Sequence, residues 1–95
     1  MSFLKSLFGR KSEAESGEAK PTKTIEYEGY TIYAMPYRAE GQYQTAGLIE
    51  KEIAGERKEH KFVRAERHAS IDEATEFSLV KGRQIVDQVG ERMFR

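Results

Sequence analysis

Apolar residues at helical spacing in the C-terminal part of the chain predict one long helix over Ser70–Phe94. At about 100° per residue, one face gathers these side chains: Ile71, Ala74, Gly82, Ile85, Val86, Val89 and Met93, with Leu79 at its edge. Ser70 and Glu73 form an S-x-x-E capping box, in which a hydroxyl and a carboxylate satisfy free backbone N–H groups. We therefore expect Ser70 to be the N-cap, and Gly82 to let the helix approach a sheet closely.

Before this helix, β-branched and aromatic residues dominate three stretches, which predict three strands. The strands are Ile25–Tyr37, Tyr43–Ile53 and Arg57–Glu66, joined by the loops Pro36–Gln42 and Ala54–Glu56. Short connections favour an antiparallel meander, and one helix covers one face of such a sheet. The predicted fold is α+β: a three-stranded antiparallel β-meander followed by one long C-terminal α-helix.

Charges on the second and third strands indicate their register. With a three-residue loop, Ile53 faces Arg57 and Leu48 faces Phe62. A two-residue loop would instead create two directly opposed like-charge pairs: Lys51 with Lys58 and Glu50 with Glu59. Because opposed like charges are unfavourable, we expect the three-residue loop. Gly47 leaves a gap on the sheet that a neighbouring side chain can fill.

The first part of the chain has the composition of a linker. Residues 11–24 contain almost no large apolar residue and are rich in Ser, Glu, Lys, Gly and Pro. Such a segment buries too little apolar surface to offset the entropy of ordering. We expect residues 1–23 to be a flexible N-terminal segment and linker, and residues 24–95 to be a single α+β domain.

Residues 1–10 carry four apolar side chains at helical spacing: Phe3, Leu4, Leu7 and Phe8. Three interpretations stay open, namely a frayed terminus, docking on the domain and weak contact with a membrane surface. The apolar stretch is too short for a secretory signal and is broken by Lys5. No apolar run approaches the roughly 20 residues that a membrane-spanning helix needs. We therefore expect a cytoplasmic protein without a transmembrane segment.

The amino-acid composition excludes several classes of function. The chain has no cysteine, which excludes disulfides, thiol catalysis and cysteine-ligated zinc and fits a reducing cytoplasm. The formal net charge is +0, and from Thr24 onward 11 Lys/Arg stand against 13 Asp/Glu. Nucleic acid therefore gains no bulk electrostatic attraction to this chain.

The candidate catalytic groups have structural explanations. His60 alternates with Phe62 on a strand, His68 precedes the helix cap, and no recognised ligand spacing surrounds either imidazole. Ser70 lacks the glycine elbow that presents a nucleophilic serine. We therefore expect a protein that is not an enzyme and that uses no metal or other cofactor.

Two surfaces are candidates for binding. Tyr33 and Met35 point away from Tyr30 and Ile32, so we expect them on the sheet face that the helix leaves open. The third strand is locally basic: Arg57, Lys58, His60, Lys61, Arg64 and Arg67. Cations beside strand aromatics can hold single-stranded bases, whereas an open face or edge suits a protein partner or self-association. The balanced charge favours the protein contact.

Nearly the whole chain resembles the HlyU family of small proteobacterial proteins. The similar segments are MSFLKSLFG, EYEGYTIYAMP, YQTAGLIEKEI, KEHKFVRAERHAS and DEATEFSLVKGRQIVDQVGERMF. The most distinctive part is E-H-x-F-x-R-A, here Glu59, His60, Phe62, Arg64 and Ala65, with Ser70 following. The resemblance implies a transcriptional activator of haemolysin expression, and thus a small regulatory or binding protein. The alternative is a protein-interaction module that uses the open sheet face or edge without direct DNA binding.

Overall fold

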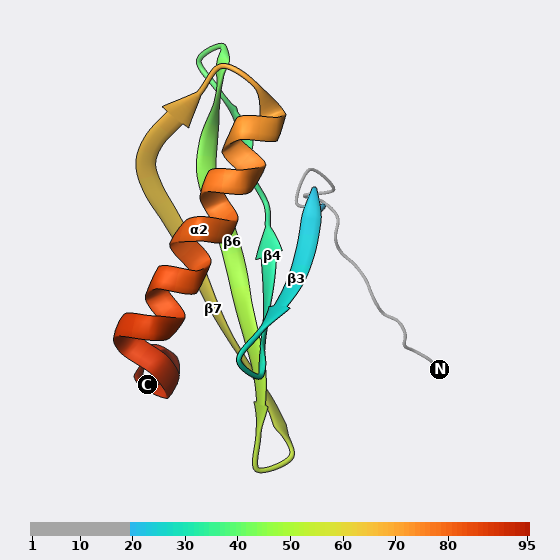
Figure 1. Ribbon diagram of the computed structural model, residues 1–95, viewed down its shortest axis with the longest axis vertical. Helices are drawn as coiled ribbons and strands as arrows, with labels where there is room; N and C mark the ends of the chain where they lie inside the picture. The colour runs from blue at the N-terminus through green and yellow to red at the C-terminus, as the bar shows by residue number, and fades with distance from the viewer. Residues whose placement is uncertain (1–19) are drawn as a thin grey trace.

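The computed structural model describes residues 20–95 and places one helix against one face of an antiparallel sheet (Figure 1). The elements in chain order are β3 (Lys23–Tyr27), β4 (Tyr30–Ala34), β5 (Tyr37–Ala39), β6 (Gln42–Ile53), β7 (Glu56–His68), α2 (Ile71–Val89) and the 3-10 helix η1 (Gly90–Phe94). The α+β class and the order of strands before helix are as expected. The sheet, however, has five strands rather than three.

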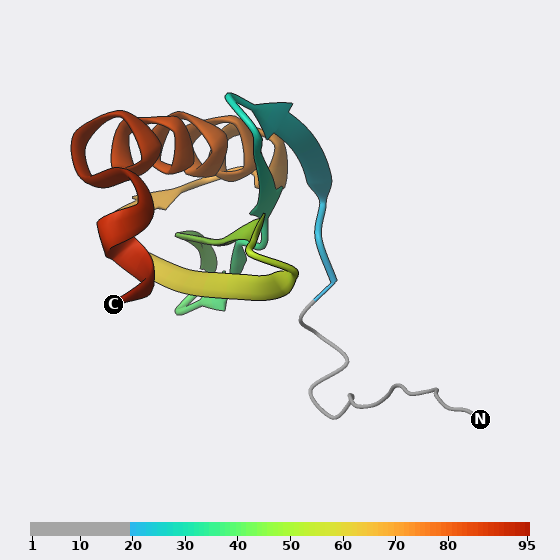
Figure 2. The ribbon, with the colours of Figure 1, turned by 90° about the horizontal axis from the view of Figure 1, so that it is seen from below.

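The sheet is built around the long strand β6. Strands β4 and β5 follow one another along one edge of β6, β7 pairs with its other edge, and β3 lies outside β4. All these pairings are antiparallel. Figure 2 shows α2 as a second layer over the sheet. Within residues 20–95, this arrangement leaves one sheet face without a covering helix.

The prediction of a single first strand over Ile25–Tyr37 is wrong. A tight turn at Glu28 and Gly29 divides it into the hairpin β3–β4, in which Tyr27 pairs with Tyr30. Both turn residues have positive φ, 54° and 86°, as type I′ hairpin turns require. The expected loop Pro36–Gln42 likewise contains β5, which turns into β6 through Glu40 and Gly41. Gly29 thus marks a hairpin turn.

The expected three-residue loop between the second and third strands is also wrong. Ala54 and Gly55 form a two-residue turn with φ of 54° and 83°, and Ile53 pairs with Glu56. The one-residue change of register places Phe62 opposite Gly47 instead of Leu48. Turn geometry therefore decided the register, and the side-chain charges adapted to it.

The opposed like charges are relieved by partners that do not lie directly across the ladder. Three ion pairs do this: Lys58 Nζ to Glu56 Oε1 at 2.9 Å, Arg57 Nε to Glu50 Oε2 at 3.7 Å, and Lys51 Nζ to Glu91 Oε2 at 3.1 Å. Because exposed charges interact weakly and have several neighbours to choose from, repulsion between opposed pairs is a poor guide to register here.

The predicted cap and apolar stripe of the helix are confirmed. Ser70 is the N-cap of α2, and its Oγ accepts a hydrogen bond from the Glu73 N–H at 3.1 Å. The core cluster between helix and sheet contains Tyr30, Ile32, Ala34, Ile49, Phe62, Leu79, Ile85, Val86 and Met93. A Cβ at Gly82 would lie 2.5 Å from Ile32 Cγ2, so glycine is what allows this close approach.

Two hydroxyl contacts, one buried and one part-buried, fix α2 to the sheet. Ser78 is fully buried, and its Oγ accepts a hydrogen bond from the Ala46 N–H at 3.2 Å. Thr75 Oγ1 lies 2.6 Å from Thr22 Oγ1, just before β3 begins. The second contact joins the first described residues of the chain to the first turns of the helix.

Candidate functional site

The sheet face opposite α2, which we call the open face, carries a mixed set of side chains. Strand alternation and the observed register place on it Thr31, Tyr33, Leu48, Glu50, Arg57, Glu59, Lys61 and Val63. Tyr33 lies opposite Leu48, and Leu48 lies opposite Lys61, which makes one continuous cross-strand row. The next row joins Thr31, Glu50 and Glu59.

A polar cluster crosses three strands of the open face. The Tyr33 hydroxyl donates a hydrogen bond to Glu50 Oε1 at 2.7 Å, and Glu50 Oε2 lies 3.7 Å from Arg57 Nε. Burial of the ring, followed by the hydrogen bond to Glu50, raises the pKa of Tyr33 to about 12. The phenol therefore stays neutral at physiological pH and acts as a donor that orients Glu50.

Apolar groups lie beside this cluster. Tyr33 and Leu48 are half-buried, whereas Val63 is 54 % exposed although it belongs to the interior of a strand. Val63 pairs with Ala46 on the face away from Phe62, which is buried under the helix. An apolar centre bordered by Arg57, Lys61 and carboxylates is the arrangement typical of protein contact surfaces.

The structure separates the other predicted site residues. Lys58 and His60 lie on the helix side of β7, opposite Lys51 and Ile49. Arg64 donates to the Val63 carbonyl at 3.2 Å. Arg67 Nε donates to Gln44 Oε1 at 2.8 Å, and its Nη1 lies 3.0 Å from Glu40 Oε1. The basic residues of β7 thus alternate between faces, and Arg57 and Lys61 share the open face with Tyr33.

Met35 follows the end of β4 at Ala34. It is half-buried and lines a cleft of about 650 Å³ where α2 begins. The lining of this cleft is Lys20, Thr22, Met35, Pro36, Tyr37, Arg38, Tyr43 and Ile71. Sequence reasoning missed the cleft because its walls come from segments far apart in the chain. The exposure of the Tyr37 side chain, 42 %, is visible only in the folded chain.

The two histidines, His60 and His68, both lie on β7. Residues 20–95 contain no group of three or more His, Asp or Glu side chains that could hold a metal ion. His68 packs its ring against Phe77, with 4.9 Å between centroids. No described helix is long and apolar enough to cross a membrane.

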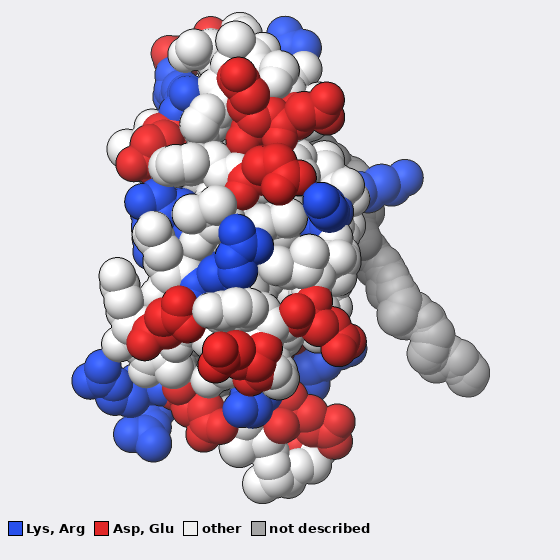
Figure 3. All heavy atoms as spheres, in the orientation of Figure 1, with Lys and Arg blue, Asp and Glu red and all other residues white. Residues whose placement is uncertain are grey.

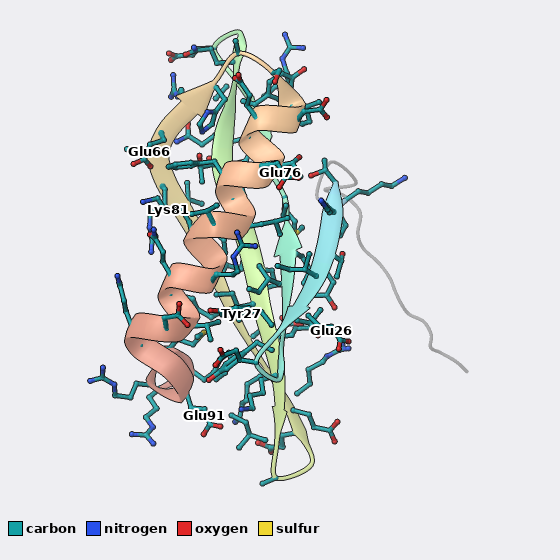
Figure 4. All side chains as sticks on the ribbon, viewed as in Figure 1. Glu26, Tyr27, Glu66, Glu76, Lys81 and Glu91 are labelled. Atoms are coloured by element: carbon teal, nitrogen blue, oxygen red, sulfur yellow. The ribbon has the colours of Figure 1, made fainter. Side chains whose placement is uncertain are left out.

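The exposed side of α2 is mixed in charge and acidic at its start. The first turn carries Asp72 and Glu73, and Glu76 follows, paired with Lys23 at 3.1 Å. Figure 3 shows acidic and basic side chains interleaved over the drawn residues on this side. Figure 4 shows Tyr27 reaching from β3 toward α2, where its hydroxyl donates to Asp87 Oδ1 at 2.9 Å. This helix therefore presents no basic stripe to a phosphate backbone.

These features define a small α+β protein whose described residues cover one sheet face and leave the other to solvent. The sequence matches the family described as "Transcriptional activator HlyU" over residues 2–94. The chain therefore belongs to the HlyU family, which indicates a transcription-linked regulatory role. Neither the curated proteins nor the solved structures include a significant match to the chain.

Proposed function

We propose that this protein is a non-enzymatic, cytoplasmic regulator that influences transcription through a protein contact on its open face. The observation that carries the proposal is the exposed Val63 beside Tyr33, Leu48 and Lys61 on the sheet face without a helix. Tyrosine and arginine are frequent anchors of protein interfaces, and Tyr33 and Arg57 are held there by Glu50.

Duplex DNA reading by α2 has less support. Recognition helices place their N-terminal residues against base edges in the major groove. In α2, that end carries Asp72 and Glu73, which a DNA backbone would repel. The opposite side of α2 is buried on the sheet through Leu79, Ile85 and Val86. The helix therefore covers the core on one face of the sheet.

Nucleic-acid binding through β7 is the second candidate. Arg57, Lys61 and Arg64 offer positive charge near the Phe62 and Tyr33 rings, as single-strand binders do. Against it, Arg57 and Lys58 are already paired with Glu50 and Glu56, and the basic side chains point to both faces. A protein partner fits the open face better.

One matched pair of variants tests the proposed function in the native host. Val63→Glu places a charge at the centre of the open face, and Gln84→Glu places the same charge on the exposed side of α2. We expect the strain with Val63→Glu to lose the transcriptional response of the wild-type strain and the strain with Gln84→Glu to keep it. Circular dichroism should show that both variants are folded. An equal response from both variants would contradict a role for the open face.

A binding assay separates the two candidates. We expect the purified full-length chain to show no sequence-specific duplex binding in a gel shift with excess competitor DNA at moderate salt. Retention of a defined duplex under those conditions would contradict the proposal. Binding of single strands that is lost in Lys61→Glu would favour the nucleic-acid function of β7.

A further inference from the structure

The cleft at the start of α2 is lined mainly by apolar and aromatic side chains. Its volume of about 650 Å³ lies within the range of ligand pockets. Met35, Pro36 and Ile71 line it together with the Tyr37 and Tyr43 rings. The Arg38 guanidinium lies 5.4 Å from the centre of the Tyr43 ring and so flanks the aromatic wall.

The chain itself enters the fold through this cleft. Lys20 is the first described residue and also belongs to the cleft lining. Two residues later the backbone is fixed, because Thr22 N–H donates to the Ala34 carbonyl at 2.8 Å. Thr22 Oγ1 lies 2.6 Å from Thr75 Oγ1, and Lys23 Nζ lies 3.1 Å from Glu76 Oε2. Whatever precedes Lys20 in the chain therefore starts at the cleft wall.

We propose that the cleft is the binding site of the apolar segment Phe3–Phe8 of the same chain. This segment offers Phe3, Leu4, Leu7 and Phe8 at helical spacing. The connecting residues 9–19 can span at most about 3.3–3.6 Å each, so the segment is held close to its site. Tethering over such a length gives effective concentrations in the millimolar range, and a modest apolar contact is then populated.

The path of the chain also favours the cleft over the open face. To reach the open face, the segment would have to pass around the β3 edge, because Lys20 starts near α2 on the other side of the sheet. The segment thereby acts as a built-in competitor, and any other apolar ligand of the cleft must displace it.

Paramagnetic relaxation in the full-length chain tests this inference directly. Because the chain has no cysteine, Ser6→Cys carries a single nitroxide label beside the apolar side chains. We expect strong loss of amide signal at Tyr37, Arg38 and Ile71, and no loss at the Ala54–Gly55 turn. In the labelled Leu4→Asp/Leu7→Asp variant the loss at the cleft should disappear. The matched control Ser12→Asp/Ser16→Asp adds the same charge outside the segment and should keep it.

Three outcomes would overturn the inference. Signal loss centred on Leu48 and Lys61 would place the segment on the open face. Signal loss that is absent or evenly spread would show that the segment has no site on the fold. Loss seen only when a labelled copy is mixed with an isotope-enriched unlabelled copy would show that the cleft takes the segment of a second molecule.

Discussion

Phe62 fills the space that Gly47 leaves on the neighbouring strand. A Cβ at Gly47 would lie 2.5 Å from Phe62 Cζ and 2.6 Å from the Tyr33 carbonyl oxygen. The tip of the ring thus lies over Gly47, and Phe62, which is 3 % exposed, belongs to the core beneath α2. The expected gap at Gly47 is confirmed. The register that places Phe62 in this gap is that of the two-residue loop, which the pattern of charges had disfavoured.

This contact predicts a large effect for a small substitution. Gly47→Ala should destabilise the fold by about 1–3 kcal/mol, because overpacking forces the ring or the backbone to move. Chemical denaturation of the variant measures the change. The loss of stability in the double variant Gly47→Ala/Phe62→Leu should be smaller than the sum of the losses in the two single variants. Strict additivity would show that the ring does not occupy the glycine gap.

The helix cap gives a second prediction. Ser70→Ala removes the acceptor of the Glu73 N–H and should lower the free energy of unfolding by roughly 1 kcal/mol. Ser70→Asp, which restores a capping oxygen, serves as the control and should regain most of that stability. Equal stability of Ser70→Ala and the wild type would mean that the cap contributes nothing.

The Tyr33–Glu50 pair gives a pH dependence with a defined sign. The pKa of Tyr33 is raised from 10.0 to about 12 in the folded protein, so the unfolded chain loses this proton first. Stability from this group is therefore complete below pH 10 and falls as the pH rises from about 10 to 12. In thermal unfolding scans, Tyr33→Phe should show a weaker decline over this range than the wild type. Tyr37→Phe, which alters an exposed ring, should leave the decline unchanged.

The turn residues offer a stabilising prediction. Ala54 has a φ of 54°, a region that costs residues with a Cβ roughly 1–2 kcal/mol and that asparagine tolerates. Ala54→Asn should therefore stabilise the β6–β7 hairpin by up to about 1 kcal/mol, measured by denaturant midpoint. Ala54→Val, with a branched Cβ at the same φ, should destabilise it. A reversed order of the two variants would contradict the assigned turn.

Local patterns explain which parts of the fold were predictable. The cap at Ser70 and the apolar stripe of α2 depend on residues within a few turns of each other, and both were predicted correctly. The alternation of Ile32 and Tyr33 likewise assigned their faces. The turn at Glu28 and Gly29 was missed, and the expected loops around Gly41 and Gly55 were too long. In each turn the residue before the glycine is of a type that is unusual at positive φ.

The binding surfaces were predictable only in part. Tyr33 was expected on the uncovered face because alternation along one strand is a local property. Met35 lies beyond the end of β4 at Ala34, where strand alternation no longer assigns a face. The cleft depends on the approach of Lys20, Arg38 and Ile71, which tertiary packing alone brings together. The alternation of basic residues along β7 was visible in the sequence, but its consequence depended on the register.

Site-specific photo-crosslinking in the native host tests the central claim most directly. A photoreactive benzoylphenylalanine replaces Val63 on the open face or, as the control, Gln84 on the exposed side of α2. We predict a discrete protein adduct from position 63 that is missing from position 84 and is lost when Lys61→Glu is added. No adduct from position 63, the same adducts from both positions, or adducts to DNA instead of protein would contradict regulation through a protein contact on the open face.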